Sequence, residues 1–263
     1  MEPTRAPALG PAAAAPDVSA PPLPNCAECP HRRDLLTQGR CTPGDVCVRS
    51  MNGREIERFF RVNPALAEDC AGDDCWERRA IAARYVSQPT LLALLRDPDE
   101  TVRRVLAYRL PVEALDVLAT DPDREVRVMV AQRLPPERVE RLATDPDYLV
   151  RQYVARRLPI GRLFRMLRDP DSQVRVTVAD RLPLESLGLL RNDPEPEVRI
   201  KVAERIGCEE VNGLTQDPDW RVRLRLAQRL PGHLLAALLD DSDPDVRATA
   251  QARAAANSPT TDR

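Results

Sequence analysis

The chain has 263 residues, a formal net charge of -2 and an aromatic content of 3%. So few aromatic residues exclude a core built mainly on Phe, Tyr and Trp, and we expect a core of Leu, Val and Ala instead. The 39 Lys and Arg residues are balanced by 41 Asp and Glu residues, so no whole-protein field would attract nucleic acid or anionic lipid.

The two ends of the chain are predicted to be disordered. Residues 1–25 are rich in Ala and Pro and hold few large apolar side chains, and residues 254–263 are similar. Such segments cannot bury enough apolar surface to offset the entropy of ordering. The first residues also lack the basic start and continuous apolar stretch of a secretory signal, and the chain contains no run of 18 apolar residues. We therefore expect a cytoplasmic protein without a membrane span.

Four closely spaced cysteines predict a metal centre in a small domain over residues 26–72. Cys26 and Cys29 form a C-x2-C pair, and Cys41 and Cys47 form a C-x5-C pair. Four such thiolates can hold an iron-sulfur cluster or a tetrahedral zinc ion, and spacing alone separates these poorly. The looser second pair departs from the two short knuckles of common zinc modules, which favours the cluster. A reducing compartment also favours metal ligands or buried thiols over disulfides.

Several other residues near these pairs invite a functional interpretation. Cys70 and Cys75 can be ligands or a redox pair, but we interpret them as small buried thiols at the start of the following segment. His31 can be a rare ligand, and we favour a hydrogen-bonding or simply exposed role for it. A cluster of aromatic residues is interpreted as a core that docks the metal domain onto that segment, rather than as an electron relay. These aromatic residues are Phe59, Phe60, Trp76 and Tyr85.

Residues 73–253 are dominated by a 24-residue repeat, in about seven and a half copies. A valine followed by an arginine recurs in each copy after the first, as in Val150-Arg151. An aspartate opens each copy and is usually followed by proline; these aspartates are Asp73, Asp97, Asp121, Asp145, Asp169, Asp193, Asp217 and Asp241. A fixed period of this kind is the signature of a solenoid in which each unit packs only on its neighbours.

Each repeat is predicted to contain one α-helix. The opening aspartate is expected to be the N-cap, with the proline at the first helical position. The acidic residue four positions before the recurrent arginine, such as Asp147 before Arg151, is expected to pair with it. One stripe of the helix is apolar and predicts the face toward the core; in one repeat it consists of Val150, Val154, Ala155 and Leu158.

The rest of each repeat is short and follows a proline that ends the helix. Leucines three residues apart, such as Leu187 and Leu190, predict a 3-10 helix or one tight helical turn there. The unit is shorter than the paired helices of TPR, ankyrin or HEAT repeats, and it lacks the β-branched run of an ordinary leucine-rich repeat strand. We therefore predict an all-α solenoid with a small metal-binding domain on its N-terminal side.

The motif D-P-D-x-x-V-R-x-x-V-A-x-R-L-P-x-x-x-L-x-x-L resembles the leucine-rich repeat variant (LRV) family, and the upstream C-x2-C-P-H-R resembles the iron-sulfur domain that precedes those repeats. The resemblance covers nearly everything after residue 25. It implies alternating α and 3-10 helices in a right-handed superhelix, and a 4Fe-4S cluster, with zinc as the alternative metal. The resemblance implies no established activity. Members of the family occur in nitrogen-fixing bacteria, which gives only a contextual expectation.

No motif in the sequence assembles an acid, a base and a nucleophile, and none forms a phosphate-binding loop. We therefore expect a protein that is not an enzyme and takes no small-molecule substrate. The favoured function is an interaction scaffold for a protein partner, with a structural or redox-sensing cluster; an electron carrier that docks on a redox partner is the alternative.

Nucleic-acid binding would rest on the arginine ladder, but aromatic residues for base stacking are scarce. This ladder consists of Arg103, Arg127, Arg151, Arg175, Arg199 and Arg223.

Overall fold

The computed structural model describes residues 26–211 and 213–256, so the predicted tail of residues 1–25 lies outside it. Regular structure in these residues is helical throughout, apart from one isolated bridge between Thr42 and Val46. This confirms the predicted all-α class. The chain divides into two compact units, Met1–Leu106 and Ala107–Arg263, which are described in turn.

The first unit contains the four-cysteine segment and the first repeats. Asn52 caps its longest complete helix by accepting a hydrogen bond from the Arg54 amide at 3.0 Å, and this helix packs on the helix of the first repeat. The elements are η1 (Cys26–Glu28), η2 (Arg32–Leu36), α1 (Gly53–Val62), η3 (Pro64–Leu66), α2 (Ala67–Cys70), α3 (Trp76–Ala82), α4 (Gln88–Ala93), η4 (Leu94–Arg96) and most of α5 (Glu100–Arg109).

An aromatic core joins the cysteine domain to the first repeat within this unit. Phe59 and Phe60 of α1 are at most 1% exposed, and their rings lie edge to face with centroids 5.5 Å apart. Tyr85, from the first repeat, stands 6.0 Å from Phe60 and donates its hydroxyl to Glu57. The predicted docking core is thus present. Trp76 does not belong to it, because this first residue of α3 is 44% exposed.

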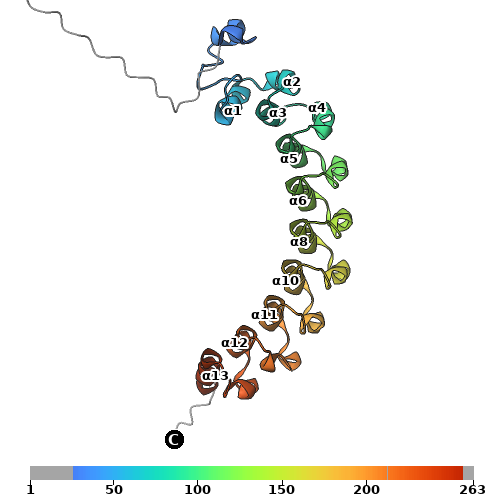
Figure 1. Cartoon of the computed structure of the whole chain (residues 1–263), viewed down its shortest axis with the longest axis vertical. Helices are drawn as coiled ribbons and strands as arrows, with labels where there is room; N and C mark the ends of the chain where they lie inside the picture. Colours follow the sequence, from blue (N-terminus) through green and yellow to red (C-terminus); the bar gives the residue numbers. More distant parts are fainter. Residues whose placement is uncertain (1–25, 212, 257–263) are drawn as a thin grey trace, which may run out of the picture. The chain divides into compact units, whose positions relative to one another are not determined.

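The second unit consists of two layers (Figure 1). Consecutive α-helices pack on one another and form the first layer. It contains α6 (Arg124–Arg133), α8 (Tyr148–Arg157), α10 (Ser172–Arg181), α11 (Pro196–Arg205), α12 (Trp220–Arg229) and α13 (Pro244–Ala256). The second layer contains η5 (Val112–Leu118), α7 (Pro136–Val139), η6 (Glu140–Leu142), α9 (Ile160–Leu163), η7 (Phe164–Met166), η8 (Leu184–Leu190), η9 (Cys208–Glu210), η10 (Leu214–Gln216), η11 (Gly232–Leu234) and η12 (Ala236–Leu238). The predicted alternation of α and 3-10 segments is confirmed.

The core lies between the two layers and follows the predicted pattern. All four residues of the stripe on α8, from Val150 to Leu158, are completely buried. In η8 the two leucines spaced three residues apart, Leu187 and Leu190, are 0% and 4% exposed. Burying one such side chain contributes about 1.5–3 kcal/mol relative to leaving it in water. Because each helix carries the same stripe, this contribution recurs in every repeat.

The helices begin later than predicted, because the third residue of the repeat is the N-cap. In α8 the carboxylate of Asp147 accepts the Leu149 amide at 2.8 Å, whereas the opening Asp145 lies outside the helix. Asp145 instead accepts the Asp147 amide at 2.9 Å, which holds the turn before the helix. The same third position is filled in other helices by Asp123, Asp171 and Asp219, each accepting an amide of its first turn.

The C-terminal end of the array also differs from the prediction. α13 continues to Ala256, so residues 254–256 are helical rather than part of a disordered tail. These three residues are all alanines, which have the highest helix propensity. Residues 257–263 lie outside the described part of the chain. Among the residues that the structure does describe, no helix is both long and apolar enough to cross a membrane.

Candidate cluster site and repeat junctions

A tight turn brings two of the predicted ligands together. Thr42 and Val46 exchange both of their backbone hydrogen bonds, each at 2.9 Å. Gly44 inside this turn has a φ of 76°, a backbone conformation that L side chains rarely adopt. Cys41 and Cys47 stand directly outside the Thr42–Val46 bridge, so closing the turn places the second cysteine pair side by side.

All four predicted ligands line one small cavity in the first unit, together with His31. Phe59 of α1 forms part of its wall, with its ring 5.8 Å from the imidazole of His31. His31 therefore lies beside the cysteines and is half-buried, and its predicted hydrogen-bonding role stays a prediction. The described residues contain no group of three or more His, Cys, Asp or Glu side chains placed to hold a single metal ion.

The chemistry of this cavity fits a cluster bound by four thiolates. Burial raises the pKa of the Cys41 thiol, and the neighbouring thiols Cys29, Cys47 and Cys26 raise it further, so these groups are close enough to repel one another when ionised. Positive iron would remove that repulsion, which is why metal binding and thiol deprotonation are coupled.

The surroundings of the cavity supply further stabilisation for a cluster. Arg32 and Arg49 also line it and would offset the negative charge of the cluster with its thiolates. Burial raises the pKa of Cys47, and the backbone amides of Arg49 and Ser50 act in the opposite direction by donating to its sulfur. Hydrogen bonds to the sulfurs are among the interactions by which proteins tune iron-sulfur clusters.

The three remaining cysteines lie outside this cavity. Cys70 is 7% exposed, and burial, followed by the charge of Asp73, raises the pKa of its thiol to about 11. This agrees with a buried packing role. Cys75 occupies the N-cap position of α3, where later repeats carry an acid, and it is only partly buried. Cys208 opens η9 in the second layer of the array.

The recurrent arginines form a second set of functional candidates, and they hold the repeats together. The guanidinium of Arg151 donates from Nε and Nη2 to both oxygens of Asp169 in the next repeat, at 2.8 and 2.9 Å. Its Nη1 donates to the carbonyls of Asp145 and Pro146 in its own repeat, at 2.8 and 3.2 Å. We call this arrangement a latch. Latches occur at Arg79–Asp97, Arg127–Asp145, Arg151–Asp169, Arg175–Asp193, Arg199–Asp217 and Arg223–Asp241.

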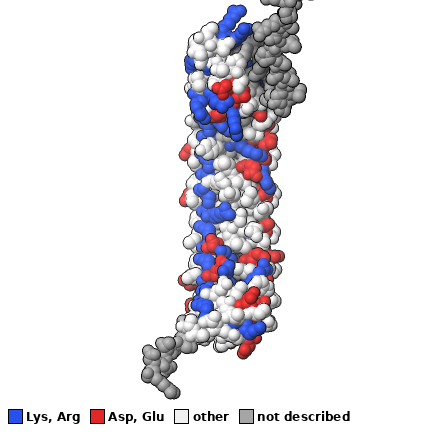
Figure 2. Space-filling view, turned by 90° about the vertical axis from the view of Figure 1, so that its left-hand side faces the viewer, with Lys and Arg blue, Asp and Glu red and all other residues white. Residues whose placement is uncertain are grey.

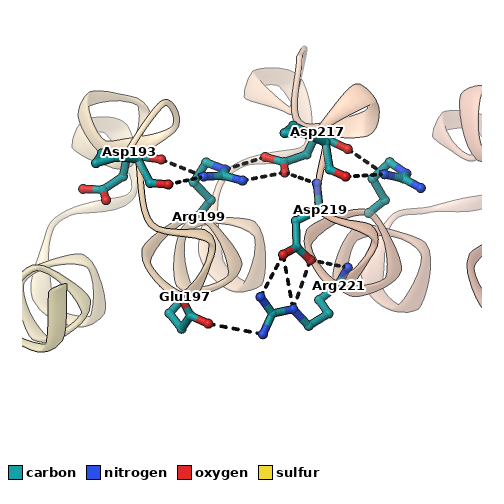
Figure 3. Close-up of polar contacts among 9 residues, drawn as sticks. Asp193, Glu197, Arg199, Asp217, Asp219 and Arg221 are labelled. Carbon is teal, nitrogen blue, oxygen red and sulfur yellow. Dashed lines mark hydrogen bonds and ion pairs between the residues drawn. The ribbon is translucent and has the colours of Figure 1, made fainter.

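Figure 3 shows one latch, in which Arg199 lies between the carbonyl side of Asp193 and the carboxylate of Asp217. Asp217 also accepts the Asp219 amide at 2.9 Å, so one carboxylate holds both the junction and the turn before the next helix. Arg221 lies on the exposed side and donates to Asp219 and Glu197. The latch itself is buried, with side chains 11% and 4% exposed.

The latches correct the predicted pairing of these arginines. Arg151 pairs with an acid 18 residues later rather than with Asp147 four residues earlier, because Asp147 already caps the helix. In the first repeat, Arg79 bonds to Asp97 and to the carbonyl of Asp73, with the same pattern as the later latches. Burial is the largest single influence on the pKa of Asp97 and raises it, but the hydrogen bonds from Arg79 and the Asp99 amide, together with the charges of Arg79 and Arg103, outweigh burial and hold the pKa below its usual range. The latch arginines thus serve as structural links between repeats.

Comparisons with known proteins agree with these features. The family "LRV protein FeS4 cluster" matches residues 23–69, and "Leucine rich repeat variant" matches residues 124–147 and 148–171. A solved structure described as "a leucine-rich repeat variant with a novel repetitive protein structural motif" is 53% identical, with a TM-score of 0.85, and covers 89% of this chain and 100% of its own.

A curated relative from Rhodobacter capsulatus, "Uncharacterized 27.7 kDa protein in nifB 3'region", is 41% identical over 86 residues. That match covers 33% of this chain and 35% of the relative, so it spans about a third of the relative's length. The solved structure, in contrast, is matched over its whole length at high identity. The chain therefore belongs to the leucine-rich repeat variant family, and its N-terminal domain is a 4Fe-4S cluster domain.

Proposed function

We propose that the protein is a scaffold that binds a protein partner along the α-helical layer of its repeats. The observation that supports this most strongly is the contrast between buried and exposed positions within one chain. Latch residues and core stripes are nearly identical from repeat to repeat, whereas the outward positions of the same helices differ. These outward residues are Gln152, Tyr153 and Arg156 on α8, and Val176, Thr177 and Asp180 on α10. A variable surface on a constant frame suits recognition of a particular partner.

The four cysteines Cys26, Cys29, Cys41 and Cys47 are proposed as the cluster ligands. A cluster held by four thiolates leaves no iron free for a substrate, so its chemistry is limited to electron transfer or structural support. The aromatic core of α1 supplies a physical link to the array, since it contains residues of both the cysteine domain and the first repeat. We propose a cluster that stabilises this end of the array or senses redox state, in a cytoplasmic protein without enzymatic activity.

Site-specific photo-cross-linking tests the scaffold. The variants are expressed in the cell of origin. Each carries a photoreactive amino acid at Gln152 or Thr177 on the α-helical layer, or at Leu189 of η8 as the control on the other layer. We expect cross-links to one protein from the first two positions and none from Leu189, which is 63% exposed and therefore more accessible than the half-buried Gln152 and Thr177. Cross-links only from Leu189, or from none of the three, would contradict the proposal.

An electron carrier is the second candidate, supported by the partial exposure of Cys26, Cys29 and Cys41. A cluster near the surface can exchange electrons with a docked redox partner. Redox titration of the anaerobically purified protein separates the two functions. The carrier is supported by a reversible one-electron couple. It also requires that cross-linking to the partner differ between the oxidised and the reduced protein while the melting temperature stays the same. A cluster whose reduction is irreversible supports the structural role.

A further inference from the structure

A second set of arginines lies at the C-terminal ends of the α-helices and is bonded differently from the latches. We call them the column arginines: Arg133, Arg157, Arg181, Arg205 and Arg229. Each donates to a backbone carbonyl in the last turn of the preceding helix or just after it, where unpaired carbonyls need donors. Arg181, for example, reaches back 26 residues to the Ala155 carbonyl at 2.7 Å. Column arginines therefore stand one per repeat, each held in place by the helix before it.

Three column arginines leave a carboxylate-binding edge open. Arg133, Arg181 and Arg205 each use Nη1 for the backbone carbonyl, as the latch arginines do. In a latch, Nε and Nη2 donate hydrogen bonds to the carboxylate of an aspartate. In these three residues Nε and Nη2 have no hydrogen-bond partner within residues 26–211 and 213–256. Since side-on pairing through these two groups is how guanidinium binds carboxylate, each of them presents half of a latch without its acid.

The charge around the column is strongly positive. The C-terminal halves of the helices, from residues 128–133 of α6 to the equivalent residues 248–253 of α13, hold nine basic residues and two acidic ones, a net charge of +7 (nine minus two). The two acids are already paired: Lys201 contacts Asp180 and Glu204, and Arg225 contacts Glu204. The space-filling view of the α layer shows a line of blue along one side (Figure 2).

The spacing of the column selects among polyanions. Neighbouring packed helices lie about 8–10 Å apart. A polyproline II segment has three residues per turn and rises about 3.1 Å per residue, so every third side chain returns to one face after about 9.3 Å. A nucleic-acid strand places its phosphates more closely and also needs aromatic side chains for its bases. The spacing therefore fits an acidic extended peptide better than a nucleic acid.

We propose that the column arginines bind an extended acidic segment of a partner protein that carries a carboxylate at about every third residue. This rests on the proposed scaffold and names the chemistry of its partner. The open edges of Arg181 and Arg205 bind successive carboxylates of that segment, and Arg133 binds the carboxylate two places before the one at Arg181, because Arg157 stands between them. Each contact completes the arrangement that Asp169 supplies inside a latch.

Fluorescence anisotropy with defined probes tests the proposal on the full-length holoprotein. The probes are a labelled peptide of six Glu-Pro-Pro units, a peptide of the same composition with its glutamates in one block, and an oligodeoxythymidine of equal charge. The triple variant Arg133→Gln, Arg181→Gln and Arg205→Gln is compared with a matched triple variant at exposed arginines outside the column. The control positions are Arg124, Arg141 and Arg165, whose side chains are 55%, 48% and 76% exposed.

We expect the periodic peptide to bind most tightly, and its affinity to fall about tenfold or more in the column variant, because three ion pairs with the peptide are lost. The control variant removes the same charge and should bind as the wild type does. Equal loss in both variants, or equal binding of the block peptide, would overturn the proposal. Tighter binding of the oligonucleotide would assign the column to phosphate instead.

A second measurement keeps the test valid if the Gln variant folds poorly. Peptide is titrated into the wild-type protein while the arginine Nε–H resonances are followed by NMR, and those of Arg133, Arg181 and Arg205 should shift first. Unchanged resonances would refute the proposal without any variant. If the peptides fail to bind while photo-cross-links from Gln152 persist, the scaffold stands and only the acidic segment is wrong.

Discussion

Replacing Arg151 by Met removes one latch in the middle of the second unit, and its cost follows from the geometry. The side chains of Arg151 and Asp169 are 9% and 4% exposed, so the remaining carboxylate would be buried without its partner. The Asp171 amide, 2.9 Å away, is the one hydrogen bond that it retains. Breaking a buried pair by removing one member costs about 3–5 kcal/mol.

Guanidinium-induced unfolding followed by far-UV circular dichroism measures this cost. The stability of a repeat array is approximately the sum of the stabilities of its repeats and of the interfaces between neighbours. Weakening one interface is therefore expected to give an early partial unfolding transition rather than a uniform shift of the whole unfolding curve. Arg165→Met is the control, since that side chain is 76% exposed and its pair with Glu140 contributes at most about 1 kcal/mol. The double variant Arg151→Met, Asp169→Asn should be less damaged than Arg151→Met alone. A single-variant curve that matches the Arg165→Met curve would refute the buried-latch reasoning.

Four further outcomes are expected. Val150→Asp should cost about 3–5 kcal/mol by burying an unpaired charge, and an unchanged melting temperature would show that the repeat register is wrong. Glu195→Asp should raise stability by about 0.5–1 kcal/mol, because Glu195 makes no side-chain cap whereas aspartates at this position do; unfolding curves that overlay would contradict the capping argument. The double variant Cys26→Ser, Cys41→Ser should lose iron, sulfide and visible absorption on anaerobic purification, and full retention of iron would remove these residues from the ligand set. Hydrogen bonding by Arg223 holds the pKa of Asp241 below its usual range. The stabilisation from this ionised carboxylate is therefore complete above the ordinary carboxyl pKa of about 3.9 and is lost as pH falls through the lowered pKa. Thermal melts from pH 6 to pH 2 should show a melting temperature that stays constant above about pH 4 and falls only below it.

The repeat length and core positions were predictable because burial follows the sequence directly. The positions of Val150 and Leu158 within the repeat are also apolar in the other repeats. The simple explanation of this recurrence is a buried face that all the helices share. The four-cysteine domain was predictable for a similar reason, since short spacings keep thiols close together whatever the fold around them. The assignment of the four cysteines as ligands stays a prediction.

The partners of the arginines were not predictable from spacing. Asp147 and Asp169 each stand at a constant distance from Arg151, four residues before it and 18 residues after it, and that relation repeats along the array. Periodicity cannot choose between two partners that recur equally well. The local one was preferred because it needs no tertiary structure, and it was wrong because capping the helix already occupies Asp147. Trp76 was misplaced for a related reason, since closeness in sequence to Phe60 does not determine the side of a helix on which a residue lies.

The latches also bear on how such arrays change length during evolution. Each latch joins the arginine of one repeat to the aspartate that opens the next, with nearly the same hydrogen bonds at Arg127, Arg175 and Arg199. Duplication or deletion of 24 residues inside the array, wherever in the repeat the stretch starts, therefore restores an existing junction and creates no new interface. Unequal recombination between repeats can lengthen or shorten the protein in whole steps while every intermediate remains able to fold, so the reach of the binding surface can evolve independently of its stability.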